Sequence, residues 1–231
     1  MKTIGLLGGL SWESTVPYYR IINEAVRAQL GGLHSARIVL YSFDFDEVAA
    51  LQKAGEWDAS TRLLGQTGAA LKAAGADCIA ICTNTMHRHA AEIEQLAGIP
   101  LLHIADAAAG PIRAAGLRKV GLLGTRFTME DRFYQDHLLL HGIEAIVPDE
   151  AGREIVHRVI YEELCQGIIR AESRTAYQAI VAALAARGAE GIVLGCTEIP
   201  MLLQAGDCAL PLFDTGLIHA GYIARWALAD H

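Results

Sequence analysis

The sequence lacks the features that mark nucleic-acid-binding and membrane-spanning proteins. Its 19 lysines and arginines are scattered, and the formal net charge is −7, which argues against nucleic acid and anionic membranes as partners. No apolar stretch approaches the roughly 18 residues that a membrane-spanning helix requires. The apolar start, Ile4–Leu7, is too short for a signal peptide and runs into a glycine turn at Gly8 and Gly9. We therefore interpret it as a first strand and expect a cytoplasmic protein.

The sequence also lacks the usual signatures of disulfide, zinc and nucleotide sites. An odd number of cysteines, five, argues against a disulfide framework. There is no CxxC pair, and His87 and His89 lie two residues apart rather than the three or four that place two side chains on one helix face. We interpret these two histidines as surface or capping residues. Gly5–Gly9 lacks the G-x-G-x-x-G spacing of a dinucleotide site. We expect no metal and no cofactor.

What the sequence does contain is a long internal repeat in a chain able to bury a core. Hydrophobic residues make up 52% and charged residues 19% of the 231 positions. Lys2–Gly8 recurs as Arg118–Gly124, and Ala74–Thr83 recurs as Arg187–Thr197. The repeat distance of roughly 115 residues is too long for a solenoid. It predicts two related domains.

Each half alternates strand and helix patterns. Short apolar or β-branched runs predict strands at 4–7, 36–42, 77–81 and 101–104, and at 120–123, 145–147, 191–194 and 212–213. Amphipathic patterns predict helices at 16–30, 61–74, 85–96, 129–141, 154–166, 173–186 and about 219–229. This order predicts an α/β fold of two pseudo-symmetric domains, each a parallel sheet with helices on both faces. We expect one domain to comprise residues 1–98 with about 214–231, and the other residues 99–213.

Cys82 and Cys196 occupy matched positions in the repeat. Each follows a predicted buried strand and precedes a threonine. In open α/β sheets ligands bind beyond the carboxyl ends of the strands, so pseudo-symmetry predicts an active site in the cleft between the domains, with one thiol on each wall. Inversion of a stereocentre needs this arrangement, because one base removes a proton from one face of Cα and an acid returns one to the other. The pair predicts a racemase.

A single cysteine at a strand end is more often a small buried hydrophobic residue than a catalytic group. The repeat makes that interpretation improbable for Cys82 and Cys196, because both cysteines lead into threonine at equivalent points. Cys78, Cys165 and Cys208 have no matched partner. We interpret those three as structural.

Polar and glycine-rich segments beside the cysteines predict the substrate contacts. Thr83, Asn84 and Thr85 are residue types that cap helices, and backbone N–H groups at such a start bind carboxylates. The glycine turns after the first strand of each half bring the backbone close to a ligand. The predicted substrate-binding residues are Gly9, Leu10, Ser11, Thr83, Asn84, Thr85, Thr125, Arg126, Thr128, Thr197 and Glu198.

These motifs resemble the aspartate/glutamate racemase superfamily. The resemblance rests on Gly5–Gly9 with Ser11, on Cys82-Thr83-Asn84-Thr85 and on Gly195-Cys196-Thr197-Glu198, and it spans both halves. It implies two related parallel sheets, an interdomain active site, no pyridoxal phosphate and, commonly, a homodimer. It also implies that the two motif cysteines are the acid/base pair acting on a small amino-acid substrate.

The departures from the family pattern bear on the substrate. Cell-wall glutamate racemases carry Asp-Ser after the first strand and His after the second Cys-Thr, where this sequence has Gly9-Leu10 and Glu198. Archaeal-type aspartate racemases have an Arg after the second strand, absent here, and a Lys where this sequence has Cys165. The chain is more similar to enterobacterial homologues of broad specificity. Arg126 is the predicted cation for a distal carboxylate.

The sequence is also compatible with two other function classes. Hydantoin racemases, maleate isomerases and arylmalonate decarboxylases use one or two cysteines at these positions of the same fold. A non-enzymatic module that closes on an amino acid would need no paired cysteines. Asn84 and the amide cradle favour a free α-carboxylate and so favour the amino-acid racemase.

Overall fold

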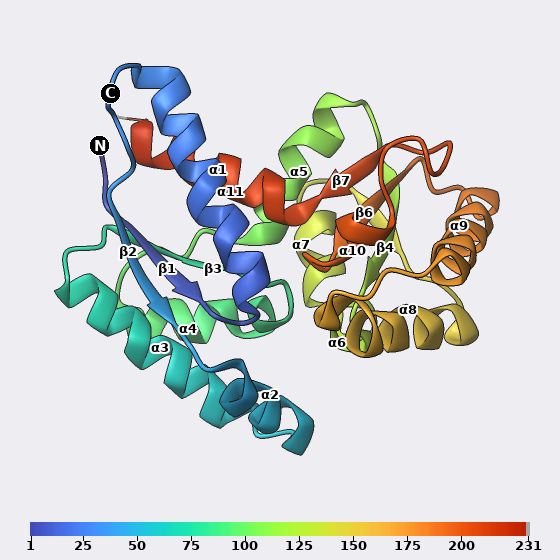
Figure 1. Cartoon of the computed structure of the whole chain (residues 1–231), viewed down its shortest axis with the longest axis horizontal. Coiled ribbons are helices and arrows are strands. Elements are labelled where there is room, and N and C mark those ends of the chain that lie inside the picture. Colours follow the sequence, from blue (N-terminus) through green and yellow to red (C-terminus); the bar gives the residue numbers. More distant parts are fainter. Residues whose placement is uncertain (230–231) are drawn as a thin grey trace. The chain divides into compact units, whose positions relative to one another are not determined.

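The computed structural model describes residues 1–229, which form two compact units (Figure 1). Unit 1 comprises Met1–Ile104 together with the chain from His219 onward, and unit 2 comprises Ala105–Ile218. Each unit contains its own parallel sheet. None of the helices in residues 1–229 combines the length and the apolar character that crossing a membrane requires.

Unit 1 is built on a three-stranded parallel sheet of order β2-β1-β3. Its strands are β1 (Ile4–Gly8), β2 (Ile38–Ser42) and β3 (Cys78–Ile81). Its helices are α1 (Trp12–Leu30), α2 (Phe45–Ala54), α3 (Trp57–Ala73), the 3-10 helix η1 (Thr85–His89), α4 (Ala90–Ala97) and most of α11 (Thr215–Leu228).

Alternate residues of the strands divide unit 1 into two cores. Ile79 and Ile81 of β3 pack into a cluster with α3 and α4, whereas Cys78, Ala80 and Cys82 pack into a second cluster with α1 and α11. Period-2 alternation of side chains explains the division, because neighbouring residues of a strand point to opposite faces of the sheet. Figure 1 shows α1 on one face of this sheet and α3 and α4 on the other. Cys82 thus belongs to the face covered by α1 and α11.

Unit 2 repeats this plan with one further strand. Its sheet has the order β5-β4-β6-β7, from β4 (Lys119–Gly124), β5 (Glu144–Ile146), β6 (Gly191–Gly195) and β7 (Leu212–Asp214). Its helices are α5 (Ile104–Ala114), α6 (Arg126–Glu130), α7 (Phe133–Leu140), α8 (Glu150–Glu162), the 3-10 helix η2 (Leu164–Gln166), α9 (Ala171–Ala186) and α10 (Ile199–Leu202).

The predicted fold class is confirmed, and the sheet orders show the internal symmetry. In each unit the first strand lies between the second and the third, as β2-β1-β3 and β5-β4-β6. In unit 1 a single parallel bridge joins Ile79 to Leu101 on the outer side of β3, where unit 2 has the full strand β7 beside β6. The repeat in the sequence is therefore a repeat of topology.

Several predicted elements are wrong in extent. The predicted strand 101–104 is reduced to the bridge at Leu101, because α5 begins at Ile104. The predicted helix 85–96 is a 3-10 turn followed by α4, and the predicted helix 129–141 is two helices, α6 and α7. Asn84 precedes the 3-10 turn in an α-helical backbone conformation and makes no side-chain cap, so the expected capping at that point does not form.

Three helices were not predicted from the sequence. Helix α2 begins after Asp44, whose carboxylate accepts from the backbone N–H of Asp46, and ends at Gly55 in the left-handed conformation. These are ordinary start and stop signals of a helix. Helix α5 is rich in alanine, which has high helix propensity, but it contains Pro111, a residue type that usually interrupts a helix. Helix α10 is a single turn of four residues.

Candidate active site

Cys82 follows the last residue of β3, and its backbone is fixed on both sides. Its N–H donates to the Leu7 carbonyl at 3.0 Å. Its carbonyl lies 3.1 Å from the Ser14 hydroxyl of α1, whose proton it shares with the Ser11 carbonyl at 2.8 Å. The side chain is 0% exposed within its core cluster. Burial raises the pKa of the Cys82 thiol well above its usual range because the thiolate would lose hydration. This cysteine is a neutral thiol at pH 7 in the structure.

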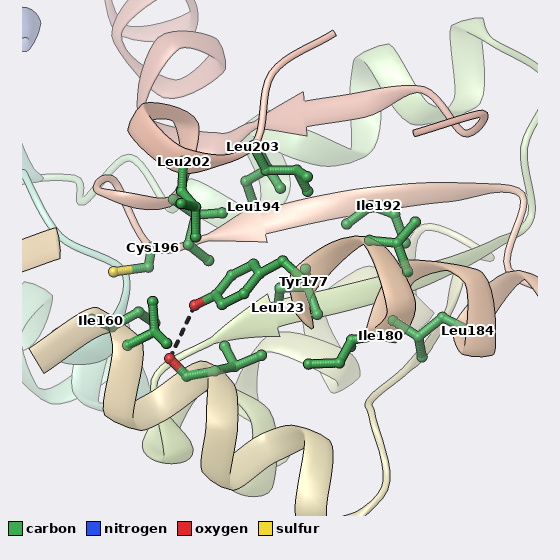
Figure 2. Close-up of a cluster of buried hydrophobic side chains, with 14 of the residues drawn as sticks. Leu123, Ile160, Tyr177, Ile180, Leu184, Ile192, Leu194, Cys196, Leu202 and Leu203 are labelled. Atoms are coloured by element: carbon green, nitrogen blue, oxygen red, sulfur yellow. Dashed lines mark hydrogen bonds between the residues drawn. The ribbon is translucent and has the colours of Figure 1, made fainter. Parts of the chain in front are cut away.

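Cys196 follows the last residue of β6 and donates a hydrogen bond to a carboxylate. Its Sγ lies 3.0 Å from Oε2 of Glu198, and that oxygen also accepts from the Thr197 hydroxyl at 2.8 Å. Figure 2 shows Cys196 at the edge of the unit 2 core, beyond Tyr177, whose hydroxyl donates to the Val156 carbonyl at 3.0 Å. Burial first, and then the negative charge of Glu198, raises the pKa of the Cys196 thiol.

The loop after Cys82 is held by a histidine. The Nδ1 of His87 lies 2.8 Å from the Thr83 carbonyl, so the ring donates there. His87 is buried at 2% exposure, and its interpretation as a surface or capping residue is therefore wrong. Asn84 and Thr85 are also buried, and Thr83 is half-buried. The three predicted substrate-binding residues of this loop lie within three positions of the thiol.

The first glycine turn requires a glycine at position 9. Gly9 has φ +74°, and a Cβ there would lie 2.3 Å from the Phe43 carbonyl oxygen. The Gly9 N–H donates to the Thr15 hydroxyl at 2.9 Å. Leu10 is buried in the core, so only its backbone is available to a ligand. The Ser11 hydroxyl donates to the carboxylate of Glu13 at 3.1 Å.

The second turn, after β4, is a short helix start. Thr125 caps α6 by accepting from the Thr128 N–H at 3.3 Å, and the Thr128 side chain is fully buried. Arg126 forms an ion pair with Glu154, with both side chains about half exposed. The predicted cation of the site is thus already paired with a carboxylate of its own unit.

The remaining cysteines differ in their surroundings. Cys78 is buried within β3. Cys208 is half-buried, and its thiol donates to the Leu210 carbonyl at 3.5 Å. Cys165 packs against the same cluster that contains Cys196. No local pattern in the sequence indicates that Ser14, in the distant helix α1, contacts the Cys82 carbonyl.

Unit 2 also contains a histidine–carboxylate cluster that the sequence analysis missed. Oδ1 of Asp106 in α5 lies 3.1 Å from Nδ1 of His137 and 2.9 Å from Nε2 of His141. The two histidines are four residues apart, which is the spacing of neighbours on one helix face. Imidazole and carboxylate are metal-ligating groups, but here they hydrogen-bond one another and link α5 to the α7 region.

Comparison with known proteins identifies the family. The Asp/Glu/hydantoin racemase family model matches residues 7–223. The chain belongs to the Asp/Glu/hydantoin racemase family. Its fold is that of the Asp/Glu racemases, and the family assignment makes it a racemase by class.

Individual relatives agree with this assignment. A crystal structure from Yersinia pestis, described as a candidate Asp/Glu racemase, is 55% identical, covers 99% of this chain and 100% of that chain, and superposes with a TM-score of 0.93. An aspartate racemase homologue from Pyrococcus horikoshii is 33% identical, with coverage of 99% and 100% and a TM-score of 0.84. The broad specificity amino-acid racemase RacX of Bacillus subtilis is 24% identical over 218 residues, covering 92% of both chains.

The contact between Cys196 and Glu198 generates a test. Replacing Glu198 by Gln removes a negative charge that raises the pKa of Cys196, so that pKa should fall. We expect alkylation of Cys196 by iodoacetamide, followed by mass spectrometry, to begin at lower pH in Glu198→Gln than in wild type. The exposed Glu172→Gln variant is the matched control. A profile that is unchanged, or shifted to higher pH, would show that Glu198 does not control this thiol.

Proposed function

We propose that this racemase-family protein interconverts the L and D forms of amino acids without a cofactor, using Cys82 and Cys196 as its two acid/base groups. The observation that carries the proposal is the equivalence of the two thiols. Each follows the third strand of its sheet and each precedes a threonine. One buried cysteine at a strand end is compatible with a purely structural role. Two cysteines at equivalent positions of a repeated fold favour a reaction that needs two proton-transferring groups.

The proposed chemistry is a transfer of one proton at each face of Cα. A thiolate removes the Cα proton and becomes a thiol, and the electron pair stays on the substrate as a carbanion delocalised into its carboxylate. The second thiol then donates its proton to the opposite face and becomes a thiolate. The atoms balance, and the enzyme ends with its two protonation states exchanged. The reverse direction starts from that exchanged form.

A thiolate must form before the reaction begins, and the site offers a route at Cys196. Both thiols are neutral in the substrate-free structure because burial raises their pKa values. The proton of Cys196 already points to the Glu198 carboxylate. The positive ammonium group of an arriving amino acid favours the charged form of a nearby thiol. We propose that substrate binding, with Glu198 as the proton acceptor, generates the thiolate.

The proposed carboxylate site is the backbone after Cys82. Backbone N–H groups stabilise a developing oxyanion more effectively in a water-poor site than in water. Thr83, Asn84 and Thr85 supply such groups within three residues of the Cys82 thiol. We propose the turn at Gly9–Ser11, and Thr125, Thr128, Thr197 and Glu198, as the remaining substrate-binding segments, without Arg126, whose side chain is paired with Glu154. Leu10 would take part through its backbone alone, because its side chain is in the core.

We propose a broad range of substrates, with acidic amino acids accepted but not required. The ion pair between Arg126 and Glu154 leaves no net charge on that pair for a distal carboxylate. Similarity to the broad specificity amino-acid racemase of Bacillus subtilis supports the same conclusion.

A cytoplasmic location and a homodimer are part of the proposal. An exposed apolar stripe on α1, formed by Trp12, Val16 and Tyr19, supports the dimer.

The two-thiol proposal predicts the behaviour of five single variants. Racemisation should fall by at least about 100-fold in Cys82→Ser and in Cys196→Ser, which is the lower end of what a positioned acid or base contributes. The matched controls, Cys78→Ser, Cys165→Ser and Cys208→Ser, should stay within a few-fold. The measurement is circular dichroism or chiral chromatography over a panel of amino acids that includes aspartate, glutamate, homoserine and methionine.

Each outcome of that panel has a defined meaning. If the wild-type protein racemises a hydantoin and no amino acid, the substrate class is the hydantoins and the proposed one is wrong. A Cys196→Ser variant that racemises as fast as wild type would refute the two-thiol mechanism.

The substrate range predicts the effect of removing Arg126. A charge-assisted hydrogen bond to a distal carboxylate contributes roughly 1.5–3 kcal/mol, equal to about one to two factors of ten in specificity. Because Arg126 is paired with Glu154, we expect Arg126→Ala to leave the ratio of kcat/KM for aspartate over homoserine within about threefold of wild type. A selective tenfold loss of aspartate activity would assign the distal carboxylate to Arg126.

A further inference from the structure

A network of buried histidines lies against the loop that follows Cys82. His87, His103 and His219 are all buried, at 2%, 6% and 0% exposure. The ring of His87 lies 4.7 Å from that of His103 and 5.6 Å from that of His219, in edge-to-face arrangements. All three belong to unit 1. Three polar rings in one core are unusual, because buried polar groups destabilise a protein unless each has a hydrogen-bond partner.

His219 anchors this network as a neutral ring. Its Nε2 lies 2.7 Å from the Leu102 carbonyl, which can only accept, so Nε2 carries the proton. Its Nδ1 is then an acceptor for the Tyr18 hydroxyl at 2.9 Å. Burial lowers the pKa of His219 to about 3. Both nitrogens are thus satisfied without a charge, and the ring against which His87 packs is fixed by α1 and the Leu102 segment.

Two hydrogen bonds fix the peptide groups on either side of Thr83. The Cys82 carbonyl accepts from Ser14, and the Thr83 carbonyl accepts from Nδ1 of His87. In a trans peptide the N–H points opposite to the carbonyl of the same plane. The N–H of Thr83 is therefore directed away from Ser14, and the N–H of Asn84 is directed away from His87. Those are the N–H groups proposed above to bind the substrate carboxylate.

We infer that His87 is a positioning residue, whose Nδ1–H holds the Thr83 carbonyl so that the N–H of Asn84 is presented to the carboxylate of the substrate. The inference rests on the proposed function, since it assigns a role to that carboxylate site. His87 does not contact the reacting atoms in this account. It acts through the orientation of one peptide group, and His219 and His103 keep its ring in place.

Two amide variants separate this role from simple packing. In His87→Asn the side-chain amide lies near the position of Nδ1 and can still donate to the Thr83 carbonyl. In His87→Gln the amide lies near the position of Nε2 and cannot reach that carbonyl in the same way. We expect kcat/KM to stay within about threefold of wild type in His87→Asn and to fall at least tenfold in His87→Gln, chiefly through KM. The exposed His34→Gln variant is the control.

A binding measurement keeps the inference testable independently of turnover. The dissociation constant of L-aspartate, measured by isothermal titration calorimetry, should rise about tenfold in His87→Gln but stay within about threefold of wild type in His87→Asn. Thermal unfolding of each variant reports whether it is folded, and both assays are run below the unfolding midpoint of the less stable variant.

The possible results distinguish the two claims. If wild type racemises no amino acid but binds L-aspartate, and this binding weakens in His87→Gln and not in His87→Asn, the proposed function fails and the role of His87 stands. If wild type racemises amino acids but the Asn and Gln variants behave alike in both assays, the role of His87 fails and the proposed function stands. An unchanged dissociation constant in a folded His87→Gln variant would also overturn the inference, because the loop would then bind the carboxylate without this hydrogen bond.

Discussion

Cys82 and Cys196 each follow a strand that is paired within a parallel sheet, and each thiol is buried in a protein core rather than exposed to solvent. A buried thiolate without hydration is costly, so both groups are held as neutral thiols. The surrounding polar contacts follow from this constraint. The Glu198 carboxylate accepts a hydrogen bond from the Cys196 thiol, Ser14 contacts the carbonyl of Cys82, and His87 holds the next carbonyl along the chain.

The duplicated fold accounts for how two such thiols arise in one chain. Each unit places its first strand between the second and the third, and the cysteine follows the third. Gly9, which follows the first strand of unit 1, lies too close to the Phe43 backbone for any side chain to fit. The two cysteines differ in their polar surroundings: the Cys196 thiol donates to a carboxylate, whereas Ser14 and His87, near Cys82, contact backbone carbonyls. This asymmetry suits a pair in which one thiol loses its proton first.

The sequence was sufficient for the fold class, the repeat and the motif cysteines, because hydrophobic alternation and strand-end motifs are local in the chain. It was insufficient for elements set by tertiary contacts. Leu101 looks like a strand residue but makes only one bridge before α5 begins. His87 looks like a surface residue because its neighbours are polar, whereas His103 and His219, distant in sequence, enclose it.

The same limit applied to the candidate site. Arg126 lies near a glycine turn in the sequence, but its ion-pair partner Glu154 lies in another helix, and no local sequence pattern indicates the pair. Glu198 was recognised from its motif, yet its contact with the Cys196 thiol is visible only in the structure. The spacing of His137 and His141 was a local signal that the sequence analysis overlooked.

The central claim is that two different thiols serve the two faces of Cα, and the fate of the Cα proton in D₂O tests it most directly. Starting from one enantiomer, early in the reaction, the product enantiomer should carry deuterium at Cα while the recovered substrate remains unlabelled. This follows because the thiol that donates to the product exchanges with solvent before the reaction and is not the group that removed the proton. Product that retains the original proton, or label that appears equally in both enantiomers from the start, would contradict the two-thiol account.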